Sequence, residues 1–168
     1  MKLEILKYPD PRLTEVSRPV EKFDEKLHKL LDDMAETMYA ANGIGLAAPQ
    51  VNLKSRIFVI DLGEDEERPA KRYEFINPKL SGAGGKIVFE EGCLSVPGFT
   101  EEVTRKDHIT VDFQDRDGKP QRIQAEGLLA VAIQHENDHL DGIVFIERLS
   151  PLRRRLARRK LAKKAVTL

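Results

Sequence analysis

The segment HENDHLDGIVF, residues 135–145, contains the residue pattern His-Glu-x-x-His. On a helix this spacing places His135 and His139 on one face, where two imidazoles can bind a metal ion. The preceding residues 128–134 are mostly apolar, which predicts a helix buried in the core. Because a carboxylate buried there without a partner would be costly, the context favours a metal site over two ordinary helix histidines.

Two histidines need a third protein ligand to hold a catalytic metal, with a further position left open. The longer protease pattern continues to a third histidine, but that position is Phe145 here. Downstream, Asp141 is too close on the same turn, and Glu147 is followed by no helix with suitable spacing. The ligand therefore has to come from upstream, where His108 lies in an expected strand without site-like surroundings.

Cys93 is the other upstream candidate and the only cysteine, so no intramolecular disulfide can form, which fits a reducing compartment. It lies in EEGCLSVPG, residues 90–98, where small and turn-forming residues end a strand and leave the thiol accessible. The residues alone leave three roles open. Cys93 is a small buried hydrophobe, a nucleophile activated by a histidine, or the third ligand of a Cys-His-His metal site.

The rest of the chain has to supply the elements that position these residues. Apolar residues at steps of three and four predict a helix over residues 24–42, with Asp24 as its N-cap. We expect an α+β fold in which antiparallel strands pack around a buried central helix carrying the His-Glu-x-x-His pattern, in a single domain over residues 1–168. Strands are expected at residues 56–62, 73–80, 86–92, 101–115 and 121–127, with a hairpin turn at 115–118.

A basic helix is expected at the C-terminal end, over about residues 151–166, with Ser150 as N-cap and Pro151 at its first position. Residues 151–168 contain eight Lys or Arg and no acid, so the first 150 residues carry a net charge of minus eight. This asymmetry indicates either a polyanionic partner such as nucleic acid or a solvated helix face.

The opening residues MKLEILKYPDPRL contain no apolar core of signal-peptide length. No apolar run approaches the roughly 18 residues of a membrane span. We therefore expect a cytoplasmic protein without membrane contact.

Three stretches resemble the signature motifs of the peptide deformylase family in sequence, order and separation: GIGLAAPQ (43–50), EGCLSVP (91–97) and QHENDHLDG (134–142). The opening YPDPRL and the charged C-terminal helix resemble the bacterial branch, so the resemblance covers nearly the whole chain. It implies a metal-dependent hydrolase that removes the formyl group from the N-terminal formyl-methionine of nascent proteins and releases formate.

The resemblance implies that Cys93, His135 and His139 bind one divalent metal ion. Fe(II) is usual in the family, and Zn, Ni or Co can replace it, as a thiolate with two imidazoles allows. Glu136 is implied to accept a proton from the attacking water and to pass it to the leaving amine.

An oxyanion formed in that reaction would be stabilised by the side-chain amide of Gln50 and the backbone N–H of Leu94. Gly45 is expected among the catalytic residues. Gly43 and Gly45 also let a substrate peptide pair closely with exposed backbone, although a helix end and a turn would require glycine as well.

The apolar pocket for the methionine side chain is expected from Ile44, Leu128 and Val131, which would equally suit the core. Glu91, in the second motif, is expected to contact the substrate. One position departs from the bacterial branch, which often has a basic residue where Thr100 lies. If that basic residue holds the substrate backbone, threonine weakens or alters peptide binding.

The expected partners are formylmethionyl nascent peptides and the ribosome, whose RNA phosphates would attract the helix Pro151–Val166. We expect a monomer. Two other classes remain: a metallopeptidase or amidase acting on other amides, and an RNA-binding module with a structural metal. The second would need a fourth ligand, and the sequence shows no second cysteine or third histidine near the motif.

Overall fold

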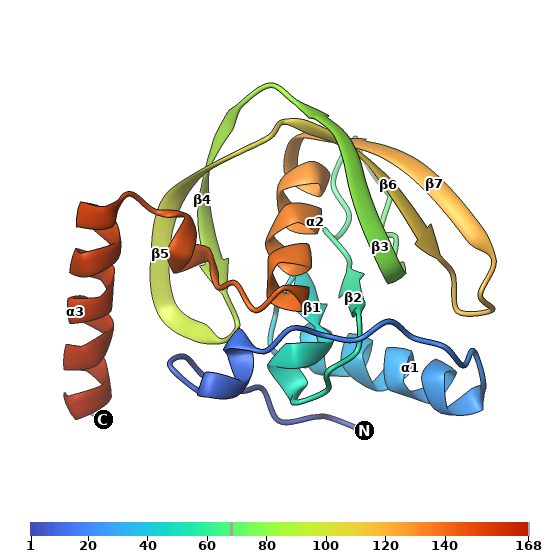
Figure 1. The fold of residues 1–168 in the computed structure, drawn as a ribbon, viewed down its shortest axis with the longest axis horizontal. Coiled ribbons are helices and arrows are strands. Elements are labelled where there is room, and N and C mark those ends of the chain that lie inside the picture. Colours follow the sequence, from blue (N-terminus) through green and yellow to red (C-terminus); the bar gives the residue numbers. More distant parts are fainter. Residues whose placement is uncertain (68, 168) are drawn as a thin grey trace.

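The computed structural model describes residues 1–67 and 69–167, and side chains up to residue 163 apart from residue 68. Helix α2 (Gly127–Leu140) stands between a five-stranded sheet on one side and the β4–β5 hairpin on the other (Figure 1). The sheet is antiparallel throughout, with strand order β1-β2-β3-β6-β7. The expected α+β fold with antiparallel strands and a C-terminal helix is confirmed.

The strands are β1 (Gly45–Ala47), β2 (Ile57–Ile60), β3 (Tyr73–Gly84), β4 (Ile87–Cys93), β5 (Val96–Arg105), β6 (His108–Gln114) and β7 (Pro120–Glu126). Strands β2, β4 and β7 lie close to the expected residues, whereas β1 was not expected and β5 begins five residues before the expected strand. Around them lie the helices α1 (Glu25–Ala40) and α3 (Pro151–Thr167) and three short 3₁₀ helices, η1 (Pro11–Thr14), η2 (Ala48–Val51) and η3 (Phe145–Arg148).

The strand expected over residues 101–115 is two strands, which is a correction to the sequence analysis. Strand β5 ends at Arg105 and belongs to the hairpin, whereas β6 begins at His108 and belongs to the sheet. Buried residues occupy odd positions on both sides of the break, Val103 before it and Ile109 after it. The alternation therefore runs through the break and hides it. Strand β3 also continues four residues beyond its expected end at residue 80.

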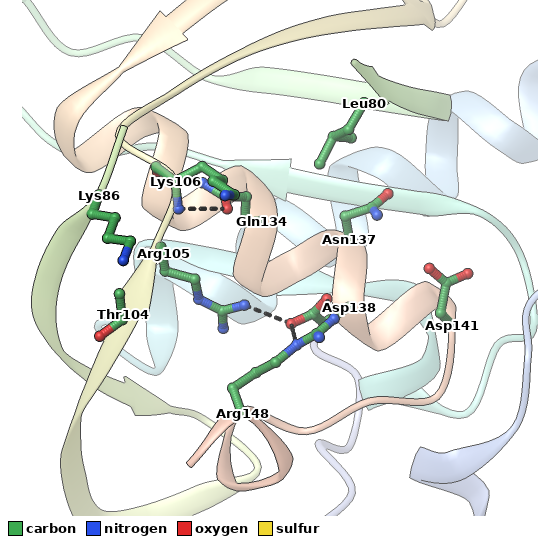
Figure 2. Close-up of a pocket in the computed structure, with 10 residues that line it drawn as sticks. All are labelled: Leu80, Lys86, Thr104, Arg105, Lys106, Gln134, Asn137, Asp138, Asp141 and Arg148. Carbon is green, nitrogen blue, oxygen red and sulfur yellow. Dashed lines mark hydrogen bonds and ion pairs between the residues drawn. The ribbon is translucent and has the colours of Figure 1, made fainter. Parts of the chain in front are cut away.

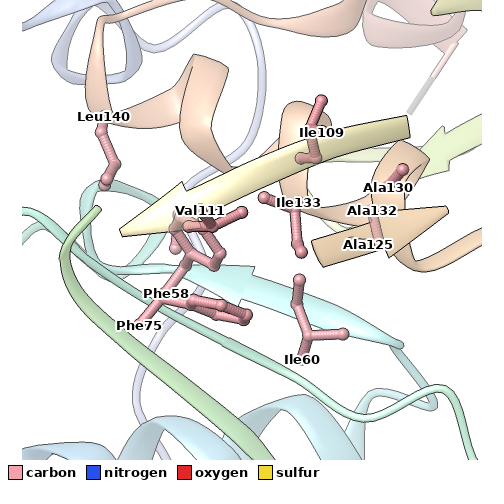
Figure 3. Packing of buried hydrophobic residues seen from close by; sticks show 11 residues of the cluster. Phe58, Ile60, Phe75, Ile109, Val111, Ala125, Ala130, Ala132, Ile133 and Leu140 are labelled. Atoms are coloured by element: carbon pink, nitrogen blue, oxygen red, sulfur yellow. The ribbon is translucent and has the colours of Figure 1, made fainter. Parts of the chain in front are cut away.

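The main core forms where α2 packs on the sheet (Figure 3). The tilted aromatic rings of Phe58 and Phe75, with their centroids 4.9 Å apart, belong to the same cluster as Ile133 of α2. Each such fully buried side chain contributes roughly 2–3 kcal/mol. The buried members of the cluster are Ala47, Phe58, Ile60, Phe75, Ile109, Val111, Ala125, Ala130, Ala132, Ile133 and Leu140. This packing fixes α2 on the sheet and leaves its opposite face directed at the hairpin.

Helix α1 begins as the sequence predicts, because the Asp24 side chain accepts a hydrogen bond from the Leu27 N–H at 3.1 Å. Its buried face carries Leu27, Leu31, Met34 and Met38. Within the described chain, no helix combines the length and the apolar character that crossing a membrane requires.

Helix α3 starts at Pro151, and the Ser150 hydroxyl accepts a hydrogen bond from the Arg153 N–H at 3.3 Å, as the sequence predicts. Ala157 is buried in a second cluster that includes Phe145 and Leu149, so the helix is attached through a small apolar contact. The described basic side chains of α3 are mostly exposed to solvent. The side chain of Lys164, also counted in the basic helix, lies outside the described residues.

Candidate active site

Three potential metal ligands meet at the junction of hairpin and central helix. Cys93 is the last residue of β4, and His135 and His139 lie one turn apart on α2. One ligand atom from each residue lies within 4.8 Å of the other two, and the Cys93 Sγ is 3.4 Å from the His139 Nε2. Tetrahedral metal–sulfur and metal–nitrogen bonds of ordinary length separate such atoms by about 3.5 Å. The donor set therefore fits a single metal ion.

The orientation of His135 is set by Glu91. The His135 Nδ1 donates to the Glu91 carboxylate at 2.8 Å, which leaves Nε2 for the ligand cluster. Two N–H groups of Arg105 bind the same carboxylate at 2.8 and 2.9 Å. All three side chains are buried. A carboxylate on the outer nitrogen of a ligating histidine is the usual arrangement in metal sites, because it fixes both tautomer and ring orientation.

Burial and neighbouring charges shift the pKa values of the side chains at the site. Burial alone would raise the pKa of Glu91, but its bonds to Arg105 and His135 outweigh burial and lower that pKa, so the carboxylate stays ionised. Burial, followed by the charges of His135 and Arg105, holds the pKa of His139 well below its ordinary value. His139 is therefore neutral in the metal-free site. Burial would lower the pKa of His135, but its hydrogen bonds to Cys93 and Glu91 outweigh burial and raise that pKa, so a bound metal would have to displace a proton from His135.

Glu136 is buried beside the ligands and has no strong partner. Its Oε1 lies 3.6 Å from the His135 Nε2, and its Oε2 makes no hydrogen bond with the described residues. Burial raises its pKa to about 7. A carboxylate with this pKa can take up and release a proton near neutral pH, as a general base and acid must.

Gln50 reaches the cluster from η2. Its Oε1 accepts the Ala47 N–H at 2.9 Å, which aims Nε2 at the Cys93 Sγ at 3.4 Å and at the Ser95 Oγ at 3.1 Å. Leu94 follows Cys93 directly in the turn between β4 and β5. Both expected oxyanion donors thus lie at the cysteine end of the metal cluster.

A groove with a volume of about 580 Å³ opens onto Cys93, His135 and Glu136. All the residues expected to contact substrate line it: Gly43, Ile44, Gly45, Glu91, Leu128 and Val131. Gly43 and Gly45 permit close packing, because an added Cβ would lie 2.6 Å from Leu94 in one case and 3.0 Å from Glu136 in the other. The carboxylate of Glu91 is already bound by Arg105 and His135, so this residue lines the groove without a free charge.

Thr100 lies on the rim of the same groove, where its hydroxyl donates to the Glu90 carboxylate at 2.8 Å. Lys7 lies elsewhere on the wall and donates to the Leu94 carbonyl oxygen at 3.1 Å. At position 100 this chain therefore has a hydroxyl that is engaged by a neighbouring acid.

Comparison with known proteins agrees with this geometry. The family model for polypeptide deformylases matches residues 2–155. A peptide deformylase from Chromobacterium violaceum is 52% identical over 162 residues, covering 96% of this chain and 95% of the relative. The chain belongs to the peptide deformylase family. It is therefore an enzyme of the hydrolase class that acts in protein biosynthesis.

Solved structures of peptide deformylases share the fold. The enzyme from Legionella pneumophila superposes with a TM-score of 0.90 at 47% identity, covering 99% of this chain and 97% of that one. The enzyme from Ehrlichia chaffeensis, solved in complex with actinonin, has a TM-score of 0.89 at 43% identity and covers 97% of both chains. Peptide deformylases bind a divalent metal ion, and the Cys93, His135 and His139 cluster is the candidate ligand set in this member.

Several site residues of this deformylase were not predicted from the sequence. Phe89, Phe99 and Ala132 add apolar surface to the groove, and Ser95 supports Gln50. Arg105 had one available signal, since it shares a strand face with buried Val103 and so points inward. An inward arginine needs a buried carboxylate, but the alternation does not identify Glu91 as that partner.

Proposed function

We propose that this chain is a metal-dependent deformylase that removes the formyl group from the N-terminal formyl-methionine of nascent peptides and releases formate. The observation that carries the proposal is the cluster of Cys93, His135 and His139 ligand atoms, all within 4.8 Å, beside buried Glu136. We assign the site one divalent ion, Fe(II) in the cell, which Zn, Ni or Co can replace because thiolate and imidazole ligands suit them all.

When bound, the metal would supply a Lewis acid that lowers the pKa of water and polarises the formyl oxygen. Glu136 accepts the proton of the attacking water, because its free Oε2 and pKa of about 7 equip it as a base. Attack on the formyl carbon gives a tetrahedral species. Glu136 then gives the proton to the amine as the carbon–nitrogen bond breaks, leaving formate and a free N-terminal methionine.

The developing oxyanion is stabilised by two donors of the chain. The Gln50 Nε2, held by the bond between Oε1 and the Ala47 N–H, faces the cysteine end of the cluster. The Leu94 backbone N–H supplies the second donor. A preorganised donor of this kind typically contributes about 3 kcal/mol to transition-state stabilisation.

The groove binds the formyl-methionyl end of the peptide. The side chains of Ile44, Leu128 and Val131 form the apolar pocket for methionine, and Gly43 and Gly45 allow the peptide backbone to approach. Glu91 acts on the substrate indirectly, since its carboxylate orients His135 while the residue lines the pocket.

We further propose that the enzyme works as a single-domain monomer in the cytoplasm and docks on ribosomal RNA through basic α3. Arg155 and Arg159 support the docking, because both are exposed and neither has an ion-pair partner among the described residues. The only cysteine is a candidate ligand, which fits a reducing compartment.

The substrate assignment is tested with three peptides of one sequence, carrying a formyl group, an acetyl group or a free amine. Enzyme purified without oxygen should release formate from the formyl peptide alone, lose activity to a chelator and regain it with Fe(II). Hydrolysis of internal peptide bonds in the free peptide would instead indicate a metallopeptidase.

A further inference from the structure

Three charged side chains meet between α2, β5 and the end of η3 (Figure 2). Arg105 comes from β5, Asp138 from α2 and Arg148 from the end of η3. The Asp138 Oδ2 accepts the Arg105 Nη1 at 2.6 Å and the Arg148 Nε at 3.0 Å. The Arg148 Nη2 donates to the Asp138 Oδ1 at 2.7 Å, so Arg148 donates a hydrogen bond to each carboxylate oxygen.

This cluster continues to the metal centre through the other side of Arg105. The Arg105 Nε and Nη2 bind Glu91, and Glu91 binds the His135 Nδ1. From the geometry we infer that Arg148 is a positioning residue for the metal centre. It holds Asp138, which fixes Arg105 and, through Arg105, the Glu91 carboxylate on His135. The inference rests on the proposed metal site and adds to it a residue beyond the contacts of the ligands.

The inner residues of this series of contacts are buried, whereas Arg148 at its outer end is partly exposed to solvent. The side chains of Arg105, Glu91 and Asp138 are 5%, 3% and 9% exposed, but that of Arg148 is 45% exposed. A cavity of about 430 Å³, lined by Arg148 and Asp138 among others, lies at this end. Because the inner charges are desolvated, their geometry depends on each partner being present.

The role of Arg148 follows from the way it binds Asp138. Arg105 contacts only Oδ2, which leaves the carboxylate free to rotate about that contact. The second bond from Arg148 to Oδ1 removes this freedom, since a bidentate guanidinium fixes the plane of a carboxylate. Without Arg148, Oδ1 would turn toward water in the cavity, and Arg105 would lose the aligned acceptor that holds it against Glu91.

The affinity for Co(II) of the full chain, stripped of metal with a chelator, tests this inference. Arg148→Met keeps the aliphatic stem and removes the guanidinium. We expect Co(II) binding about 5-fold weaker than in the wild type, less than the 10- to 100-fold loss typical when a direct partner of a ligand is removed. Arg148→Lys keeps the charge without the two-bond contact and should recover only part of the affinity. With saturating Co(II), the KM for a formyl-methionyl peptide should be unchanged.

The matched control is Arg158→Met, which removes an arginine of similar exposure, 52%, that binds Glu147 on the surface. It should bind Co(II) like the wild type. In an Asp138→Asn background, Arg148→Met should cause no further loss, because both act through the same contact. Equal Co(II) affinities of Arg148→Met, Arg148→Lys and the wild type, or additive losses in the double variant, would overturn the inference. A wild-type chain that fails to bind Co(II) would overturn the metal site itself.

Discussion

Gly45 and Glu136 are packed so closely that a side chain at position 45 would displace the Glu136 carboxylate by a few tenths of an ångström. A Cβ at Gly45 would lie 3.0 Å from the Glu136 Cδ and 3.2 Å from its Oε1. Gly45 belongs to the first motif and Glu136 to the third, and strand β1 brings them together beside α2. The absence of a side chain at Gly45 therefore leaves Glu136, the proposed general base, in its position.

Gly45→Ala should lower kcat about 10-fold while the metal content stays unchanged, because Glu136 has to move by a few tenths of an ångström. The measurement is formate release at saturating peptide, with metal analysis of the same sample. In a Glu136→Ala background, Gly45→Ala should not lower kcat any further. A full additional loss in that double variant would show that Gly45 acts on something other than Glu136.

The pKa of Glu136 makes the stability of the metal-free protein depend on pH. Burial raises this pKa from 4.5 to about 7, so folding favours the protonated form. The stability that the neutral form contributes is fully present below pH 4.5 and is lost as pH rises to about 7.

Glu136→Gln should remove this dependence. Relative to the wild type, the metal-free variant should gain up to about 3 kcal/mol of unfolding free energy between the two ends of that range. Urea unfolding at several pH values measures the difference. The same difference at every pH would mean that the Glu136 pKa is not raised. Metal-free protein is required because a bound cation favours the ionised carboxylate.

Gln50→Leu should lower kcat by about 10² to 10³-fold with little change in KM, because it removes a donor to the oxyanion. Ser95→Ala is the control, since the Ser95 hydroxyl accepts a hydrogen bond from the same Gln50 nitrogen. It should cost less than about 10-fold, because Gln50 keeps its bond to the Ala47 N–H. Similar losses in the two variants would mean that Gln50 acts by packing.

Ribosome docking is better tested by replacing charged side chains than by truncating the chain, because removing α3 would also remove buried Ala157. Arg155→Gln combined with Arg159→Gln should weaken ribosome binding and lower its salt slope by roughly 1.5 to 2. The control combines Arg153→Gln with Arg158→Gln, whose guanidiniums bind Glu101 and Glu147. Equal slopes for the wild type and both double variants would exclude an RNA contact through this face.

The elements that the sequence predicts well are those with local signals. Asp24 and Ser150 cap their helices as their side chains suggest, and apolar periodicity places α1. The break between β5 and β6 carries no such signal, because Val103 and Ile109 keep the same alternation across it. Only the pairing partners of the two strands separate them.

The residues of the candidate site also differ in how well the sequence predicts them. Its ligands and base lie in short motifs whose residue types indicate their chemistry. The supporting charges do not, because Arg105 is separated by 33 residues from Asp138 and by 14 from Glu91. Arg148 lies in a 3₁₀ helix and reads as one of many surface arginines. Such contacts are set by how the hairpin packs against α2, which no local pattern encodes.

The most direct test of the account measures metal content and formate release together in protein purified without oxygen. The wild type should contain one equivalent of divalent metal and release formate from a formyl-methionyl peptide. Cys93→Ala should lose the metal, and Glu136→Ala should keep it while kcat falls by about 10² to 10⁴-fold. A Glu136→Ala protein with an empty site, or a metal-free wild type that still releases formate, would contradict the account.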